Sequence, residues 1–478
     1  MIVTDPTKTS GLSTDYNRSY IWTISFVAAL GGLLFGYDWV VIGGAESFYE
    51  KFFNLTDPNW QGWAMSCALV GCLIGALLSG GLSDKAGRKR LLLLSAFLFA
   101  VSSIGTGCAG NFSIFVFWRI VGGVAIGLAS NLSPMYIAEV APAQARGKLV
   151  AINQLTIVIG ILLAQFINWL IADKVPSGAT PQEILQSWNG QTGWRWMFGV
   201  TAVPSLLFFT GMWLVPESPR WLAKNGKPAK AREILAKIGG EQYATQALGE
   251  INATVASEIR KVNFGDLLAP GMIKVLLLGI VLAVFQQWCG INVIFNYATI
   301  IFHNAGYDIS DTLKNIAWTG SVNMAFTFVA LGLVDRRGRR PLMLFGSMGL
   351  AVIYTVMGFC FQNQVKGLPM LLLVLAAIGC YAMSLAPVVW VVISEIFPNR
   401  IRGAAMSVCV ASLWVACFLL TFTFPKLNHA LGAAKTFWIY AGICAAGFVF
   451  ILMFLPETKG KTLEQIEKEL VGGAKAEG

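Results

Sequence analysis

Long apolar runs recur from one end of this sequence to the other, and each is long enough to cross a lipid bilayer as a helix. A helix rises about 1.5 Å per residue, so about 20 apolar residues cross a hydrocarbon core of roughly 30 Å. Hydrophobic residues make up 56% of the 478 residues and charged residues only 13%, which is too apolar for one soluble domain. We therefore expect an all-α membrane protein with twelve transmembrane helices, near residues 21–45, 61–83, 91–111, 113–138, 148–173, 195–215, 272–301, 313–334, 341–362, 368–393, 404–425 and 436–455.

Polar stretches at the start, middle and end divide the chain. They predict an N-terminal six-helix half over 1–216, a cytoplasmic linker with short helices over 217–270, a second six-helix half over 271–456 and a cytoplasmic tail over 457–478. Within the linker, residues 228–238 have helical spacing. The first twenty residues lack the composition of a cleavable signal sequence, so we expect the first apolar run to remain in the mature protein.

Lysine and arginine gather in alternate connections between the runs. Four lie at 84–90 and four more at 335–341, whereas connections on the other side hold isolated cations such as Lys51 and Lys314. Positively charged loops stay in the cytoplasm, so both termini are predicted to be cytoplasmic. The net charge of +10 is explained by this topology and does not indicate nucleic-acid binding.

Three strings on the cytoplasmic side occur twice, in the same order. The first half contains GGLSDKAGRKR, AEVAPAQARGK and PESPR, and the second contains LGLVDRRGRRP, SEIFPNRIRGA and PETKG. A duplicated six-helix unit is the simplest explanation. The corresponding residues are Asp84 and Asp335, Glu139 and Glu395, Arg146 and Arg402, and Glu217 and Glu457.

The doubled strings place opposite charges at helix ends around a shared aqueous surface. Any one of these charges could be an ordinary solvated side chain, but their repetition favours a conformational latch. Ion pairs between the halves would hold an outward-open state and separate when the protein turns inward. The predicted inner gate consists of Asp84, Arg88, Glu139, Arg146, Asp335, Arg339, Glu395 and Arg402.

Cysteine and histidine give no indication of a catalytic or metal site. All nine cysteines fall inside apolar runs, which favours free, buried thiols over disulfides. The histidines are His303 and His429, and the sequence has no metal-spaced cluster and no phosphate-binding glycine loop. We expect neither an enzyme nor a bound cofactor or metal.

The doubled strings are joined by further motifs that resemble one family over essentially the whole chain. These are WRIVGG at 118–123, PESPRWL at 216–222, QQWCGIN at 286–292 and PETKGKTLEQIE at 456–467. The sequence resembles the sugar porter family of the major facilitator superfamily, and 382–403 is most similar to bacterial proton-coupled xylose and hexose symporters. The resemblance implies a monomeric transporter of a pentose or hexose, such as xylose or glucose, in a bacterial inner membrane. It also implies a substrate site between the halves, near the bilayer midplane.

Amide side chains interrupt several apolar runs far from the expected helix ends. A carboxamide donates and accepts hydrogen bonds as sugar hydroxyls do, and a polar group in the membrane needs a partner or a wet cavity. The alternative role is hydrogen bonding between neighbouring helices. The family resemblance implies hydroxyl ligands at Gln154, Gln286, Gln287, Asn292 and Asn323.

Aromatic rings can pack against the apolar C–H faces of a pyranose. The resemblance implies this role for Trp390 and Trp414, with Phe35 as a further member. Three departures from the family pattern, Asn296, Ala386 and Leu413, leave the choice among xylose, glucose, galactose and other monosaccharides open.

Asp38 is an acidic residue inside an apolar run. Measured along their helices, Asp38 lies about 25 Å from the cytoplasmic start and Arg119 about 9 Å from the outer start, so both reach the outer half of the bilayer, where they could pair. Arg119 would favour the ionised carboxylate, whereas loss of water would favour the neutral acid, so a small rearrangement could bind or release a proton. Proton symport is our hypothesis. The first alternative is a structural ion pair in a facilitative uniporter. The second, which the sequence favours less, is a sugar sensor that does not transport.

Overall fold

The computed structural model describes residues 16–257, 267–269, 271–398, 401–459, 461 and 465, and its regular elements in these ranges are helices. The first half contains α1 Arg18–Phe52, α2 Pro58–Ala86, α3 Arg88–Gly107, α4 Phe112–Val140, α5 Arg146–Ile171, α6 Pro181–Gln186, the π-helix η1 Asn189–Gly193, α7 Trp194–Gly199 and α8 Ala202–Leu214. Two linker helices follow, α9 Pro219–Lys224 and α10 Pro228–Ser257. The second half contains α11 Met272–Trp288, α12 Ile291–Asn296, α13 Ala298–Asn304, α14 Ile309–Arg337, α15 Arg339–Gln362, α16 Leu368–Ala382, α17 Leu385–Ile396 and α18 Arg402–Phe454.

Eleven helical segments of the described chain are long and apolar enough to cross a bilayer, one fewer than the sequence predicts. The difference lies in α18, whose 53 residues would measure about 80 Å, more than twice the hydrocarbon thickness. Gly432 breaks this element with φ +78° and ψ 164°, values that a side chain would disfavour. The parts before and after Gly432 supply the last two predicted crossings, so the chain has twelve.

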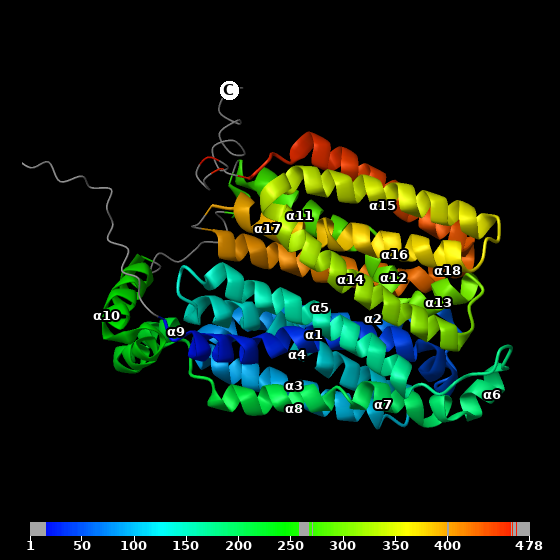
Figure 1. Ribbon diagram of the computed structural model, residues 1–478, viewed down its shortest axis with the longest axis horizontal. Coiled ribbons are helices and arrows are strands. Elements are labelled where there is room, and N and C mark those ends of the chain that lie inside the picture. Colours follow the sequence, from blue (N-terminus) through cyan, green and yellow to red (C-terminus); the bar gives the residue numbers. More distant parts are fainter. Residues whose placement is uncertain are drawn as a thin grey trace, which may run out of the picture.

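The helices form two layers that run side by side (Figure 1). Helices α1–α8 make one layer and α11–α18 the other, while α9 and α10 project at one end of the molecule and α6 lies at the other. We call these ends the linker end and the α6 end. The predicted helix over 228–238 is confirmed as the regular first part of α10, which Gly239 and Gly240 interrupt.

Breaks in two crossings of the second half shape the centre of the molecule. Gly290, with φ +87°, separates α11 from α12, and Ser384, with φ −131° and ψ −87°, separates α16 from α17. The second break explains how Pro387 is accommodated. Its ring would clash with the carbonyl of the residue four positions earlier in a continuous helix, but that helix has already ended at Ala382.

Glycine lets α1 and α5 touch along their backbones. A Cβ on Gly36 would lie 1.9 Å from the Ile157 carbonyl oxygen, and one on Gly160 would lie 2.0 Å from that of Leu33. Small residues allow such approaches in membranes, where packing rather than water drives helix association. The contact fixes α1, the helix that carries Asp38. All nine cysteines are free thiols, seven of them buried, in line with the prediction.

Candidate functional site

Asp38 of α1 and Arg119 of α4 form the ion pair that the sequence predicts. The Arg119 Nη1 donates to both carboxylate oxygens of Asp38, at 2.9 Å each. Asp38 is 6% exposed and Arg119 is 3% exposed, and the guanidinium also lies 5.3 Å from the centre of the Phe198 ring. A buried pair of this kind offsets a large desolvation cost only while both partners remain in place.

A small cavity of about 10 Å³ lies beside this pair, enough for about one water molecule. Its lining includes Asp38, Trp39 and Arg119 from the first half and Asn296 from α12 of the second. The side-chain oxygen of Asn296 is buried without a hydrogen-bond partner among the described residues. The ion pair therefore faces the interface between the halves, where a change of packing can reach it.

Three of the predicted sugar ligands lie together around the break between α11 and α12. Gln286 Nε2 donates to the Ala386 carbonyl at 3.2 Å, and Gln287 Nε2 donates to Gln286 Oε1 at 3.3 Å. Asn292 Nδ2 donates to Gln287 Oε1. The amides thus form a chain that starts at the α16–α17 break. Gln286 of α11 also has the alternative role, because its bond to Ala386 joins α11 to α17.

The other two amides lie elsewhere on the facing helices. Gln154 of α5 is half-buried, and Asn323 of α14 is buried, its backbone carbonyl accepting from Thr327 Oγ1 at 2.8 Å. Among the described residues, no hydrogen bond links either side chain to the Gln286 chain of amides. Their predicted contact with a sugar remains a proposal.

Trp414 is the centre of an aromatic cluster that joins the halves. Its ring centre lies 6.1 Å from that of Phe35 and 6.0 Å from that of Trp39, both on α1. Trp414 is 4% exposed, and its indole N–H has no partner among the described residues. The sequence reasoning missed Trp39, although its position next to Asp38 could have indicated it.

Trp390 has a different environment. It is 39% exposed and lies one turn after Ala386, whose backbone carbonyl accepts from Gln286. Trp390 is thus exposed whereas Trp414 is enclosed, and the predicted contact of Trp390 with a sugar remains a proposal.

The amide chain and the aromatic cluster meet on α18. Asn292 Nδ2 lies 3.7 Å from the sulfur of Cys417, and Cys417 follows Trp414 by one helical turn. A continuous path of contacts therefore runs from the amides through Trp414 to Trp39 and Asp38. The amides of the second half and the ion pair of the first half are thus connected through α18 and Trp39.

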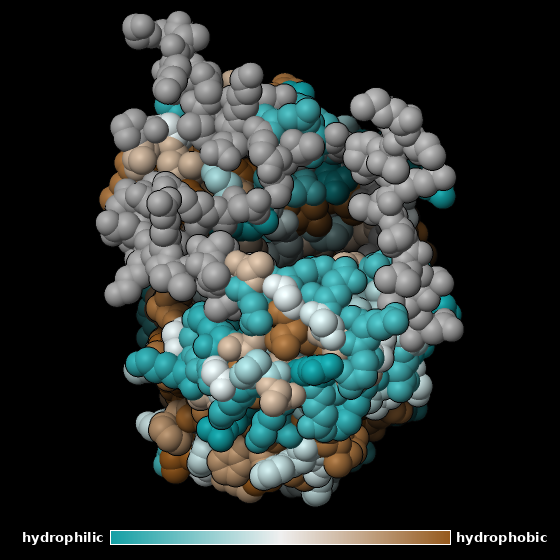
Figure 2. Space-filling view, turned by 90° about the vertical axis from the view of Figure 1, so that its left-hand side faces the viewer, coloured by the Kyte–Doolittle hydropathy of each residue, from teal (hydrophilic) through white to brown (hydrophobic). Residues whose placement is uncertain are grey.

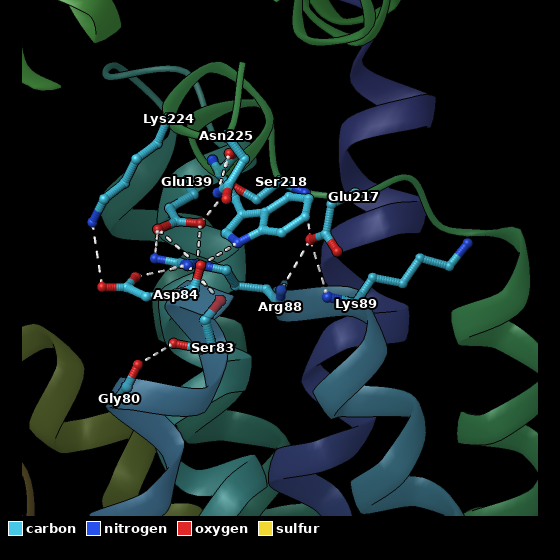
Figure 3. Close-up of polar contacts among 11 residues, drawn as sticks. Gly80, Ser83, Asp84, Arg88, Lys89, Glu139, Glu217, Ser218, Lys224 and Asn225 are labelled. Carbon is cyan, nitrogen blue, oxygen red and sulfur yellow. Dashed lines mark hydrogen bonds and ion pairs between the residues drawn. The ribbon is translucent and has the colours of Figure 1, made fainter. Parts of the chain in front are cut away.

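The doubled charges of the first half form a compact network at the linker end (Figure 3). Arg88 pairs with Glu139 at 3.0 Å and with Asp84 at 3.1 Å. Ser218 Oγ donates to Glu139 at 2.5 Å, and Glu217 accepts from the backbone N–H of Arg88 at 3.0 Å. A carboxylate at the first turn of α3 also stabilises the helix dipole.

The second half repeats these contacts. Arg339 pairs with Glu395 at 3.1 Å, Thr458 Oγ1 donates to Glu395 at 2.6 Å, and Glu457 accepts from the backbone N–H of Arg339 at 3.0 Å. Burial acts to raise the pKa of Glu457, but hydrogen bonds from backbone N–H groups outweigh it and hold the pKa below its ordinary value. The side chain of Asp335 lies outside the described residues.

Comparisons with known proteins agree with this arrangement. The family model "Sugar (and other) transporter" matches residues 24–470. The chain belongs to this sugar transporter family. The chain is 41% identical to the D-xylose-proton symporter of Escherichia coli K12, over 95% of this transporter and 97% of that protein. It is 34% identical to the glucose facilitated diffusion protein of Zymomonas mobilis, over 96% and 99%. A solved inward open conformation of the E. coli xylose transporter matches with a TM-score of 0.82 and 37% identity, over 94% of this chain and 100% of that one.

The transporter is closed at the α6 end. There Ser177 Oγ donates to Asp308 at 2.6 Å, Gln165 Nε2 donates to Thr319 Oγ1 at 3.2 Å, and Thr299 donates to Glu46, each across the two halves. At the linker end the surface is hollowed between the halves, with apolar residues visible inside (Figure 2).

Three of the predicted inner-gate contacts in the described part of the chain stay within one half. The pairs of Arg88 with Glu139 and of Arg339 with Glu395 each stay within a half, and Arg402 donates to the Phe397 carbonyl at 3.2 Å. Arg146 is exposed. A latch between the halves would have to form in another conformation, so its role remains a proposal.

Proposed function

We propose that this sugar transporter carries a monosaccharide, a pentose or hexose, together with a proton by alternating access. The observation that supports the proposal most directly is the buried pair of Asp38 and Arg119, one residue from Trp39, whose ring contacts Trp414. The E. coli relative named as a D-xylose-proton symporter agrees with it. The chemistry requires a carboxylate that can gain and lose a proton as the halves move.

The mechanism follows from the contacts. A sugar bound at the amides of α11 and α12 in the second half and at Gln154 of α5 in the first half would draw the halves together, because its hydroxyls would have partners on both sides. Protonation of Asp38 would neutralise the carboxylate and weaken its hold on Arg119, which frees α1 to shift against α4. Movement of α1 carries Trp39 with it and so changes the sugar site.

The orientation of the molecule follows from charge. Basic connections such as 84–90 lie at the linker end, so this end faces the cytoplasm, with both termini, and the conformation is inward-open. The transporter acts as a monomer in a bacterial cell membrane, where lipid covers its exposed apolar side chains such as Leu77 and Leu214.

Uptake into proteoliposomes tests the function. Purified protein is given radiolabelled xylose, arabinose, glucose or galactose, with and without an imposed pH gradient. A symporter accumulates its sugar only when the outside is more acidic, whereas a facilitative uniporter, like the relative named for facilitated diffusion, equilibrates it regardless of pH. A sensor shows binding without counterflow, and that result would end the transport proposal.

Loss of an amide should weaken sugar binding. Gln287→Ala and Asn292→Ala each remove a group of the amide chain. Because a sugar hydroxyl then loses its partner, we expect the Kd for sugar to rise about tenfold or more. Isothermal titration of the purified variants gives the Kd. Gln362→Ala, an exposed glutamine at the end of α15, is the matched control. Wild-type affinity in both site variants would assign these amides to helix packing alone.

Neutralising the predicted inner gate should favour the inward-open state. In Arg146→Gln/Arg402→Gln the inward-open conformation should lose little stability. Arg146 is exposed there, and Arg402 contacts only its own half among the described residues. An outward-open state that uses these cations across the halves would lose several charge-assisted contacts. We expect faster labelling of cysteine probes in the cytoplasmic cavity. Unchanged labelling would contradict the latch.

A further inference from the structure

Glu46 is a second acidic residue buried in α1, beyond the pair that couples to the proton. It is 2% exposed, and one carboxylate oxygen accepts a hydrogen bond from Thr299 Oγ1 of α13, itself 4% exposed. The other oxygen is buried without a hydrogen-bond partner among the described residues. The contact joins the two halves at the α6 end, the end that is closed here.

Gly43 makes a second contact on the same face of α1. A Cβ there would lie 2.8 Å from the Asn296 carbonyl oxygen and 2.9 Å from that of Phe295, so α1 and α12 touch along their backbones. Gly43 and Glu46 are one helical turn apart, so both face the second half. Closure of the α6 end therefore presses one short stretch of α1 against α12 and α13.

A cavity of about 600 Å³ borders this contact, since both Glu46 and Thr299 belong to its lining. Its lining includes Glu46, Glu50 and Lys51 of α1, His303 of α13 and Asp308 before α14. The phenols of Tyr49 and Tyr297 complete the set of charged and titratable groups around Glu46.

The hydrogen bonds of these neighbours leave Thr299 as the partner of Glu46. Lys51 Nζ donates to the Ser47 carbonyl at 2.8 Å, and Glu50 accepts from Gln61 at 3.2 Å. Glu46 borders this cavity but is only 2% exposed, so its carboxylate gains full access to water when α1 moves away from α13. A carboxyl group with one unsatisfied oxygen gains hydration when that happens.

We propose that Glu46 and Gly43 form the outer closing point of the transport cycle. The bond from Thr299 stabilises states closed to the outside, and opening exchanges it for water from the cavity. Glu46 is a positioning residue in this role, since Asp38 lies two turns deeper with Ile42 between them. The proposal rests on the alternating access proposed above, and it assigns to the outer end a polar contact unlike the charged network of the inner end.

Removal of the Thr299 hydroxyl tests the proposal. Thr299→Val keeps the shape of the side chain but leaves Glu46 without its donor when the outer end is closed, so the ratio of outside-open to outside-closed molecules should rise about tenfold. Spin labels at Asn59 in α2 and His429 in α18, both exposed at the α6 end, report the separation of the halves. The background carries Cys108→Ser, because Cys108 is exposed.

Matched variants separate gating from misfolding. Thr299→Ser restores the hydroxyl and should restore the wild-type distance distribution. Thr210→Val is the control, because Thr210 is exposed on α8 and bonds to the Leu206 carbonyl of its own helix at 2.8 Å. Gly43→Ala should open the outer end by steric contact, whereas Gly442→Ala, with nothing within 4 Å, should not.

Transport kinetics give a second readout that a merely structural role would not move. Thr299→Val should lower the external KM for sugar in counterflow while leaving the amount of folded protein unchanged. An unaltered distance distribution in both Thr299→Val and Gly43→Ala would overturn the closing point. Absence of counterflow in the wild type would instead overturn the proposed transport, and the distance measurement would still decide whether these residues close the outer end.

Discussion

Replacing Asp38 with asparagine is expected to abolish sugar accumulation driven by a pH gradient, while counterflow at equal pH continues. The carboxamide has nearly the same shape and can still accept from Arg119, which now donates to both carboxylate oxygens at 2.9 Å. It cannot exchange a proton, so sugar should only equilibrate across the membrane. Radiolabelled sugar in proteoliposomes with an acidic exterior measures the ratio of internal to external concentration.

The controls address the buried charge that this variant leaves behind. Removing one partner of a buried pair costs about 3–5 kcal/mol, so Asp38→Asn should also unfold at a lower temperature. Asp38→Asn/Arg119→Gln removes the lone cation and should regain part of that loss without regaining accumulation. Asp311→Asn, an exposed aspartate at the start of α14, should behave as wild type. Wild-type accumulation by Asp38→Asn would exclude this residue as the coupling site.

The proposed coupling requires contact between the proposed proton site and the proposed sugar site, and Trp39 would provide it. Asp38 and Trp39 are consecutive in a rigid helix, and Trp39 touches Trp414 across the halves. A displacement of α1 that breaks the ion pair must move Trp39 against Trp414. By thermodynamic reciprocity, the factor by which a bound sugar changes the affinity of Asp38 for its proton equals the factor by which the proton changes the affinity for the sugar.

The features readable from the sequence are those with a strong local pattern. The apolar runs predict the transmembrane helices, because a helix that crosses the membrane needs about 20 apolar residues. The repeated strings predict the two halves. The match of Arg88 and Glu139 with Arg339 and Glu395 follows from the repeat and is visible in the structure. Even the pairing of Asp38 with Arg119 could be predicted, because depth along a helix is simple arithmetic.

Features that depend on contact across the halves could not be predicted. Trp39 and Glu46 are single residues in a long apolar helix, and only the position of α12, α13 and α18 gives them partners. The breaks at Gly290 and Ser384 have no strong pattern either, since glycine and serine are frequent in membrane helices. The predicted latch pairs between the halves concern an outward-open state, and they stay a prediction.

Gly160→Val should disturb the packing of the first half and cause a large loss of stability. A Cβ at Gly160 would lie 2.0 Å from the Leu33 carbonyl oxygen and 2.9 Å from the backbone nitrogen of Tyr37, and backbone atoms cannot rotate away as a side chain can. Overpacking costs typically about 1–3 kcal/mol and more where nothing can move aside, and α1 would be pushed from α5 next to Asp38. Thermal unfolding and size-exclusion chromatography in detergent measure the loss.

Gly442→Val separates this steric effect from the general cost of valine in a helix. Gly442 lies in α18 with nothing within 4 Å of its added Cβ, so its variant should remain monodisperse and transport sugar. Both variants place the same β-branched side chain inside a membrane helix, and the difference between them isolates the contact between α1 and α5. Equal stability of the two proteins would mean that these backbones do not touch in the membrane. If only Gly160→Val loses stability and transport, the position of Asp38 depends on a glycine in a neighbouring helix that contributes no side chain to the site.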